Sequence, residues 1–223
     1  MPVNPSAPIE ITAFDWVPDF AKGLVRDIRA RWALEEAGLP YAERLFDARR
    51  RRPAEYFSEQ PFGQVPAFRD GDVSMFESGA IVLHVAEGSA ALMPQDADGR
   101  ARALCWLFAA LNNVEPLVME LATVDVFARG EDWATLRRPS LVAAIEAKLG
   151  CVSDALGPKA HLAGRFTVAD IVMTTVLRGL RHTDLVSRID NLAAYVARCE
   201  ARPAFQRALA DQLAAFEPQP SVQ

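Results

Sequence analysis

The feature that most constrains the fold is a proline near the start of a short apolar run, Val65-Pro66-Ala67-Phe68. Proline cannot donate a hydrogen bond to a β-ladder, so Val65-Pro66 is expected at the edge of a strand and not in its middle. If the bond before Pro66 is cis, the turn would hold the Val65 backbone N–H and C=O pointing outward. There they could pair with another extended backbone. The run therefore predicts a strand edge that accepts an extended ligand.

A hairpin signal and a Glu-Ser pair follow this run. Asp70-Gly71 stands between the apolar runs 65–68 and 73–76, and Asp-Gly in that setting is a strong hairpin turn. Glu77-Ser78 then comes where the second strand ends and a helix begins. We expect Ser78 to cap that helix, whose first-turn N–H groups would attract a carboxylate. Together these features predict a site for a short, peptide-like ligand that carries a carboxylate.

Short extended segments alternate with helical ones between residues 9 and 87. The expected strands are 9–13, 42–46, 65–68 and 73–76, and the expected helices include 24–37 and 78–87. The order β-α-β-α-β-β-α predicts an α/β thioredoxin-like domain over residues 1–88. A linker over 89–99 then leads to an all-α helical domain over 100–223.

Two features organise the helical domain. Pro116 is expected to kink or split its first long helix, because proline lacks a backbone N–H. Thr167 and Asp170 form a capping-box pattern, in which each side chain satisfies the other residue's backbone N–H. We expect the helix after Thr167 to be central and buried. Further amphipathic helices are expected over 140–156 and 191–213.

Charge and composition exclude several classes of partner. A net charge of −5 argues against a nucleic-acid partner, whose footprint would be basic. The longest uninterrupted apolar run, 104–111, is far short of the ~20 residues that a membrane span needs. The three histidines lack metal-ligand spacing, so no metal site is expected. Three widely spaced cysteines predict reduced, structural thiols in a cytoplasmic protein.

The motifs together resemble the glutathione transferase family. Gly63-Gln64-Val65-Pro66 and Phe76-Glu77-Ser78-Gly79-Ala80-Ile81 resemble its glutathione-binding half. The segment from Arg31 to Tyr41 resembles the first helix and second strand of the same domain. Phe166-Thr167-Val168-Ala169-Asp170-Ile171 resembles the capping motif of the family's helical domain. The segments lie in the expected order and cover roughly residues 9 to 205.

The resemblance implies roles for particular residues. Val65 would pair with the cysteinyl backbone of glutathione, and Pro66 would be the cis proline that shapes this edge. Glu77 and Ser78 would take the γ-glutamyl amine and carboxylate, and Gln64 would meet the glycyl end. One arginine of the run 49–52 could steer the glycyl carboxylate, although a solvated loop is the simpler interpretation.

The resemblance also concerns the second substrate and the assembly. In the family, the helix that contains Asn112 and Asn113 lines the pocket for the electrophile, so both are candidate residues of that pocket. Glutathione would be a co-substrate, and no other cofactor is expected. A homodimer is expected from the family.

The segment after the first strand departs from the family pattern. A glutathione transferase holds the glutathione sulfur as a thiolate, usually with a Tyr, Ser or Cys at this place, and residues 13–24 contain none of the three. Lowering a thiol pKa by ~2 units requires about 2.7 kcal/mol of preferential thiolate stabilisation. Helix N-terminal N–H groups supply ~0.3–2 kcal/mol. The Lys22 ammonium, or the Trp16 indole N–H, could supply the remainder, so these two residues are the catalytic candidates.

The leading hypothesis is an enzyme that joins glutathione to a small, mostly apolar electrophile. One alternative is a glutathione-binding or structural module without transferase chemistry, which the missing hydroxyl favours. Another is a glutathione-dependent thiol-disulfide oxidoreductase, which would need a cysteine at the first helix, where the sequence has none.

Overall fold

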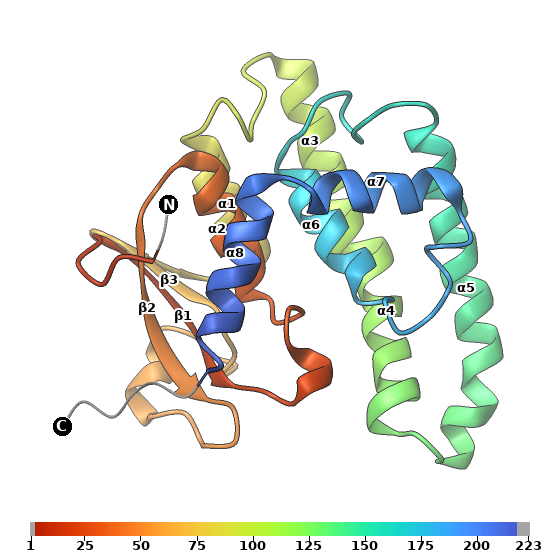
Figure 1. The fold of residues 1–223 in the computed structure, drawn as a ribbon, viewed down its shortest axis with the longest axis horizontal. Helices are drawn as coiled ribbons and strands as arrows, with labels where there is room; N and C mark the ends of the chain where they lie inside the picture. The colour runs from red at the N-terminus through yellow and green to blue at the C-terminus, as the bar shows by residue number, and fades with distance from the viewer. Residues whose placement is uncertain (1–2, 218–223) are drawn as a thin grey trace. The chain divides into compact units, whose positions relative to one another are not determined.

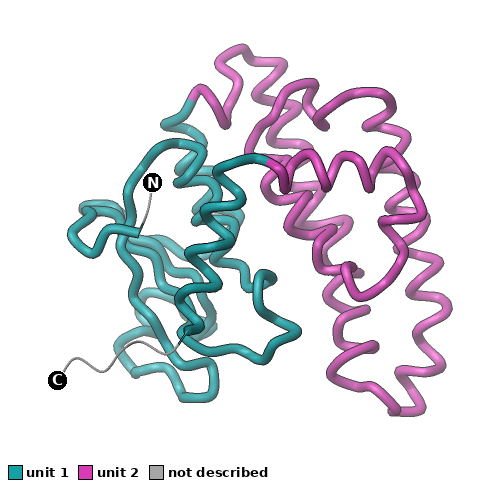
Figure 2. The backbone as a smooth tube through the Cα atoms, viewed as in Figure 1, with its two compact units in different colours: residues 1–89, 202–223 teal, residues 90–201 magenta. Residues whose placement is uncertain are grey.

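The computed structural model describes residues 3–217, whose helices and strands are shown in Figure 1. The backbone divides into two compact units, residues 1–89 with 202–223 and residues 90–201 (Figure 2). This division differs from the expected one at the C-terminal end, because the last helix, α8 (Pro203–Ala214), belongs to the first unit. Residues 1–2 and 218–223 of the expected domains lie outside the described residues.

A four-stranded sheet forms the first unit together with its helices. The strands are β1 (Ile9–Trp16), β2 (Tyr41–Asp47), β3 (Ala67–Asp70) and β4 (Val73–Phe76), in the order β2-β1-β3-β4. β1 runs parallel to β2 and antiparallel to β3, which is antiparallel to β4. The predicted thioredoxin-like arrangement is confirmed. β3 begins two residues later than expected, because Pro66 has no N–H with which to join the ladder.

The helices of the first unit begin and end at local signals. Helix α1 (Asp27–Ala37) starts later than the predicted Leu24, since Gly23 has a φ of 76° that no right-handed helix accommodates. It ends at Gly38 in the left-handed conformation, as the sequence predicts. Helix α2 (Ser78–Glu87) has the predicted bounds. Between β2 and β3 the chain forms only a short 3₁₀ helix, η2 (Ala54–Ser58), and a similar turn, η1 (Asp19–Ala21), precedes α1.

Helix α8 covers part of α1. The rings of Trp32 and Phe205 meet edge to face with their centroids 4.7 Å apart. The Gln212 side chain donates to Asp27 Oδ1 over 2.7 Å, and the Tyr41 hydroxyl donates to Asp211 over 3.1 Å. These buried contacts explain why the last helix is part of the sheet-containing unit.

The second unit is helical throughout. Its α-helices are α3 (Ala97–Ala109), α4 (Glu115–Ala122), α5 (Asp132–Leu156), α6 (Val168–Arg178) and α7 (Asp190–Glu200). Two π-helical segments, η3 (Ala110–Val114) and η4 (Thr123–Phe127), flank α4. Near Pro116, where a kink or split was predicted, the chain stays helical but passes through the π-helical segment η3 before α4, which has Pro116 in its first turn. The predicted helix over 191–213 is two helices, the second beginning at Pro203.

Helix α6 has the predicted capping box. The Thr167 N–H donates to Asp170 Oδ2 over 2.8 Å. The other carboxylate oxygen of Asp170 accepts from the Leu162 N–H over 3.1 Å and the Tyr195 hydroxyl over 3.0 Å. Nine of the eleven residues of α6 are buried, so the predicted buried helix is confirmed. The aspartate thus connects three segments of the second unit.

Two expectations from composition need adjustment. None of the three cysteines, all of which lie in the described residues, forms a disulfide, and only Cys199 is buried, whereas Cys105 and Cys151 are exposed, so two of them have no structural role in the core. By length and hydropathy, the continuous helical run 97–127 could cross a membrane, although its longest uninterrupted apolar stretch is short. A core helix of a globular protein has the same length and hydropathy, so this property is weak evidence for a membrane span.

Candidate functional site

The predicted binding residues meet at one end of the β3–β4 hairpin. In the antiparallel register Ala67 pairs with Phe76. Pro66, just before β3, and Glu77, just after β4, therefore lie next to each other across the ladder. The two segments 64–66 and 77–78 are eleven residues apart in the sequence and adjacent in the fold. The hairpin turn at Asp70-Gly71, where Gly71 has a φ of 56°, brings them together as predicted.

Val65 presents a free backbone edge at this end of the sheet. The Val65–Pro66 peptide bond is cis. Within residues 3–217, neither the N–H nor the C=O of Val65 has a hydrogen-bond partner. The Val65 side chain is buried, while the preceding Gln64 side chain is exposed. An extended ligand backbone could therefore pair with Val65 and meet the Gln64 side chain beside it.

The start of α2 is arranged differently from the prediction. Ser78 is the first helical residue, and Glu77 occupies the N-cap position without a side-chain capping bond, so the expected capping role of Ser78 is wrong. The Ser78 hydroxyl instead accepts a hydrogen bond from Arg29 Nη1 over 3.2 Å. In the described part of the chain, the N–H groups of Ser78, Gly79 and Ala80 have no hydrogen-bond partner. This helix end therefore keeps its first donors for a ligand.

Glu77 has a strained backbone. Its φ of 70° makes it the one non-glycine residue in the left-handed region among residues 3–217. Such a conformation costs of order 1–3 kcal/mol and persists only where the surrounding structure enforces it, most often at functional sites. The Glu77 side chain is exposed at the helix end, where its carboxylate could accept from a cationic group.

Arg29 is a site residue that the sequence analysis missed. It lies on α1, is 4 % exposed, and reaches Ser78 across 49 residues of sequence. A buried guanidinium beside the N-terminus of α2 adds positive charge to donors that already favour an anion. No sequence signal separated Arg29 from the other charged residues of this helix, most of which are also buried, because only its long-range bond to Ser78 distinguishes it.

The two catalytic candidates lie on separate segments. Trp16 ends β1 and is 37 % exposed, and the Arg49 guanidinium lies 4.5 Å from the centre of its ring. Lys22 follows η1, and its ammonium lies 2.7 Å from Asp19 Oδ1. Trp16 and Lys22 stay predictions.

Two arginines of the basic run 49–52 are held by hydrogen bonds and by contacts with aromatic rings. Arg49 Nε and Nη2 donate to the two oxygens of Asp47 over 2.9 and 2.8 Å, and these bonds hold the pKa of Asp47 at about 2. Arg52 donates to the Asp47 carbonyl over 2.8 Å and stacks on Phe14 at 5.0 Å. The run is therefore more than a solvated loop, because two of its guanidinium groups cover aromatic rings at the ends of β1 and β2.

The candidate residues of the second-substrate pocket belong to the second unit. Asn112 and Asn113 lie in the π-helical segment η3, and both are exposed. Lys148 Nζ lies 3.4 Å from the Asn113 side-chain oxygen. Single π-helical turns inside α-helices are frequent at functional sites, which keeps these asparagines as candidates.

Comparison with known proteins agrees with this geometry. The family model for the N-terminal domain of glutathione S-transferases matches residues 20–87. Glutathione S-transferase 4 of Zea mays is 30% identical over 204 residues, which cover 85% of this chain and 87% of that protein. A glutathione S-transferase of Hyoscyamus muticus is 31% identical over 69% of this chain and 77% of its own length.

Solved structures show the same architecture. A glutathione transferase from Burkholderia graminis, crystallised with two glutathione molecules bound per subunit, superimposes with a TM-score of 0.79 at 27% identity. The superposition covers 90% of this chain and 87% of that one. The match spans both units of the chain.

Proposed function

Because this chain belongs to the glutathione S-transferase family, we propose that it joins the thiolate of glutathione to a small, mostly apolar electrophile. The proposal rests on two sets of backbone groups without hydrogen-bond partners in the described residues, which lie at the same end of the β3–β4 hairpin. Val65 offers an N–H and a C=O to an extended backbone, and the start of α2 offers N–H groups to a carboxylate. Glutathione carries both features.

The binding roles follow from this geometry. The cysteinyl backbone of glutathione pairs with Val65 in the manner of an added strand. The γ-glutamyl carboxylate binds the N–H groups of α2 and the Ser78 hydroxyl, with the Arg29 guanidinium next to it. The Glu77 carboxylate accepts from the γ-glutamyl amine, and the exposed Gln64 side chain meets the glycyl end.

Thiolate stabilisation is assigned to Trp16 and Lys22. The indole N–H of Trp16 is a donor, and Lys22 is a cation near the segment that precedes α1. The stacked Arg49 brings a second positive charge to Trp16. About 2.7 kcal/mol of preferential thiolate stabilisation would lower the thiol pKa by ~2 units, and a donor plus a nearby cation can supply that amount.

The finer parts of the proposal concern the second substrate, the assembly and the compartment. Asn112 and Asn113 on η3 contribute to the pocket for the electrophile. The protein acts as a homodimer in the cytoplasm, where three unpaired cysteines, two of them exposed, stay reduced. Light scattering on the purified protein tests the dimer.

A pH titration of bound glutathione tests the function. The ultraviolet absorbance of the thiolate is followed with the protein saturated by glutathione and compared with that of the free tripeptide. A bound thiol pKa well below the free value of ~8.5 supports the transferase, and an electrophile screen then follows. Saturable binding with an unshifted pKa would favour the binding module that lacks transferase chemistry. No binding would overturn both.

A further inference from the structure

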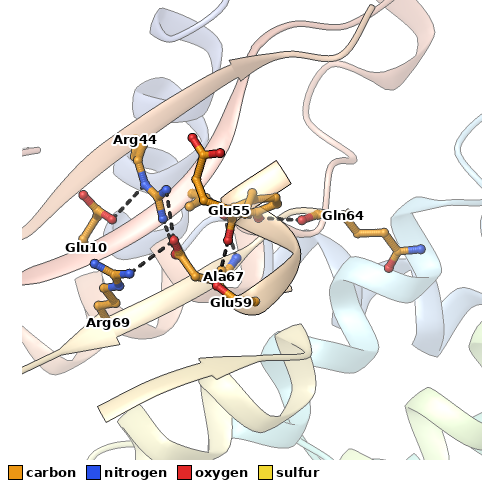
Figure 3. Close-up of polar contacts among 10 residues, drawn as sticks. Glu10, Arg44, Glu55, Glu59, Gln64, Ala67 and Arg69 are labelled. Atoms are coloured by element: carbon orange, nitrogen blue, oxygen red, sulfur yellow. Dashed lines mark hydrogen bonds and ion pairs between the residues drawn. The ribbon is translucent and has the colours of Figure 1, made fainter. Parts of the chain in front are cut away.

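The backbone groups that flank Val65 are held by side chains and not by the sheet. The Gln64 carbonyl, on one side, accepts from the Tyr56 hydroxyl over 2.6 Å. The Ala67 N–H, on the other side, donates to Thr12 Oγ1 over 2.7 Å. Thr12 Oγ1 and the Tyr56 hydroxyl lie 2.8 Å apart, so the two ends join into one chain of hydrogen bonds. Figure 3 shows the Gln64 and Ala67 ends of this chain.

The direction of each bond in this chain is determined. A carbonyl only accepts, so the single proton of the Tyr56 hydroxyl goes to Gln64. An N–H only donates, so the Ala67 bond uses a lone pair of Thr12. The proton between the two hydroxyls therefore belongs to Thr12. The order is Ala67 N–H to Thr12 O–H to Tyr56 O–H to the Gln64 carbonyl, and every donor in it is used.

The two hydroxyl side chains are immobilised by their surroundings. Thr12 is 1 % exposed and Tyr56 is fully buried, so water does not compete for their bonds. The Tyr56 ring packs on Phe46 with centroids 4.7 Å apart, and the Arg44 guanidinium lies 5.6 Å from its centre. Burial raises the pKa of Tyr56, which keeps its hydroxyl protonated.

Arg44 is itself held on both sides. It donates from Nε to Glu10 over 3.0 Å and from Nη1 to Glu59 over 3.3 Å, and Figure 3 shows this cluster. The Tyr56 ring therefore contacts both an aromatic ring and a guanidinium that is fixed by two carboxylates. Such packing fixes the position of the hydroxyl oxygen, which lies 2.6 Å from the Gln64 carbonyl.

We propose that Tyr56 and Thr12 are positioning residues for glutathione, which hold the Gln64 carbonyl and the Ala67 N–H so that the backbone of Val65 is presented to the ligand. The two bonds satisfy one backbone group on each side of Val65 that could otherwise compete with it for the ligand. The proposal rests on the proposed function. It adds two residues that do not touch the ligand and act through the backbone of the 64–67 segment.

The test uses Tyr56→Phe in the full-length protein, with glutathione affinity measured by calorimetry. Removing one hydroxyl leaves the Gln64 carbonyl and the Thr12 proton without partners, and we expect the Kd for glutathione to rise roughly fivefold. In steady-state assays the KM for glutathione should rise while kcat stays within about twofold, since the lost interaction acts in the ground state and the transition state alike. Thr12→Val breaks the same chain at its other end and should match this result, whereas Thr12→Ser keeps the hydroxyl and should restore binding.

Tyr41→Phe is the matched control. Tyr41 is also fully buried in the first unit, and its hydroxyl donates to Asp211 and not to the 64–67 segment. Both Phe variants remove one buried hydroxyl, so Tm is measured for each. The proposal requires a weaker glutathione affinity for Tyr56→Phe and an unchanged affinity for Tyr41→Phe, even where their Tm values fall equally.

The outcomes separate the two proposals. If wild-type protein does not bind glutathione, the proposed function fails. If wild-type protein binds and Tyr56→Phe and Thr12→Val bind equally well, the function stands and the positioning role is wrong. Should Tyr56→Phe not fold, Thr12→Val alone decides, because it breaks the same chain of hydrogen bonds at another residue. The double variant should lose little more affinity than either single one, since both break one chain.

Discussion

The Arg49 guanidinium stacks on the Trp16 ring, 4.5 Å from its centre, at the end of β1. A cation on the face of an indole makes its ring N–H a stronger donor, because positive charge withdraws electron density from the ring. The arginine is fixed in turn by two bonds to Asp47. This arrangement supports the proposed role of Trp16 as a donor that stabilises the glutathione thiolate.

Trp16→Phe is expected to raise the pKa of the bound glutathione thiol. Phenylalanine keeps the stacking surface for Arg49 and removes only the indole donor. A loss of about 1.4 kcal/mol would raise the pKa by about one unit, and kcat at neutral pH would fall up to tenfold. The measurement is the ultraviolet titration of bound thiolate. Trp133→Phe, at a half-exposed position on α5 in the other unit, serves as the control, and an unchanged pKa in Trp16→Phe would remove this residue from the mechanism.

Lys22 and Asp19 should act with opposite signs. The Lys22 ammonium lies 2.7 Å from Asp19 Oδ1, so part of its field is cancelled. Lys22→Ala is expected to raise the pKa of the bound thiol, and Asp19→Asn is expected to lower it, because that change removes a negative charge next to the ammonium. The same thiolate titration measures both. Equal pKa values in the two variants would show that Lys22 does not act on the sulfur.

Ser78→Ala is expected to weaken glutathione binding about tenfold or more. The change removes a donor to the γ-glutamyl carboxylate and also the hydroxyl that accepts from buried Arg29. Hydrogen bonds to charged groups contribute ~1.5–3 kcal/mol. Calorimetry measures the Kd, and Ser74→Ala on the exposed face of β4 is the control. Equal affinity in the two variants would contradict a carboxylate site at the start of α2.

The Asp47 carboxylate should titrate at about pH 2, because its bonds from Arg49 lower its pKa from 3.8. A carboxyl group whose folded-state pKa lies below its unfolded value stabilises the fold above about pH 4, and this contribution is lost as the pH falls through the folded pKa. Carboxyl-carbon NMR reports the midpoint directly. In Arg49→Gln the midpoint should move back toward 3.8, and a wild-type midpoint already near that value would show that the ion pair does not form in solution.

Thr167→Ala should cost about 1–2 kcal/mol of unfolding free energy without changing glutathione affinity. Thr167 and Asp170 form the capping box at the start of α6, and this helix is buried. Urea unfolding measures the cost, and calorimetry on the folded variant measures the affinity. A weakened affinity at temperatures far below Tm would contradict the assignment of this motif to folding.

Features with local causes could be predicted from the sequence. Pro66 marks a strand edge because it lacks an N–H, Gly38 ends α1 because it tolerates a positive φ, and Thr167 with Asp170 forms a cap across three residues. Each of these depends only on neighbouring residues. The same reasoning placed the segments 64–66 and 77–78 on one hairpin.

Features that depend on distant partners could not be predicted. Thr12 is 1 % exposed and bonded to Tyr56, 44 residues away, and no residue near it in the sequence indicates this partner. Arg29 bonds Ser78, which is 49 residues away in the sequence, and the residues next to Arg29 give no indication of this partner. The capping role expected of Ser78 failed for a different reason, because the helix begins at Ser78 itself and Glu77 occupies the N-cap position.

The last helix of the chain completes the unit that begins at the first strand. Arg202 bonds both oxygens of Glu36, at 2.5 and 2.7 Å, and Gln212 reaches buried Asp27. During synthesis, α1 is made long before these partners exist. Some 170 further residues must be added before its charged residues can form these bonds. The sheet-containing unit therefore cannot be completed as the ribosome produces it, and its final packing falls after translation has reached α8.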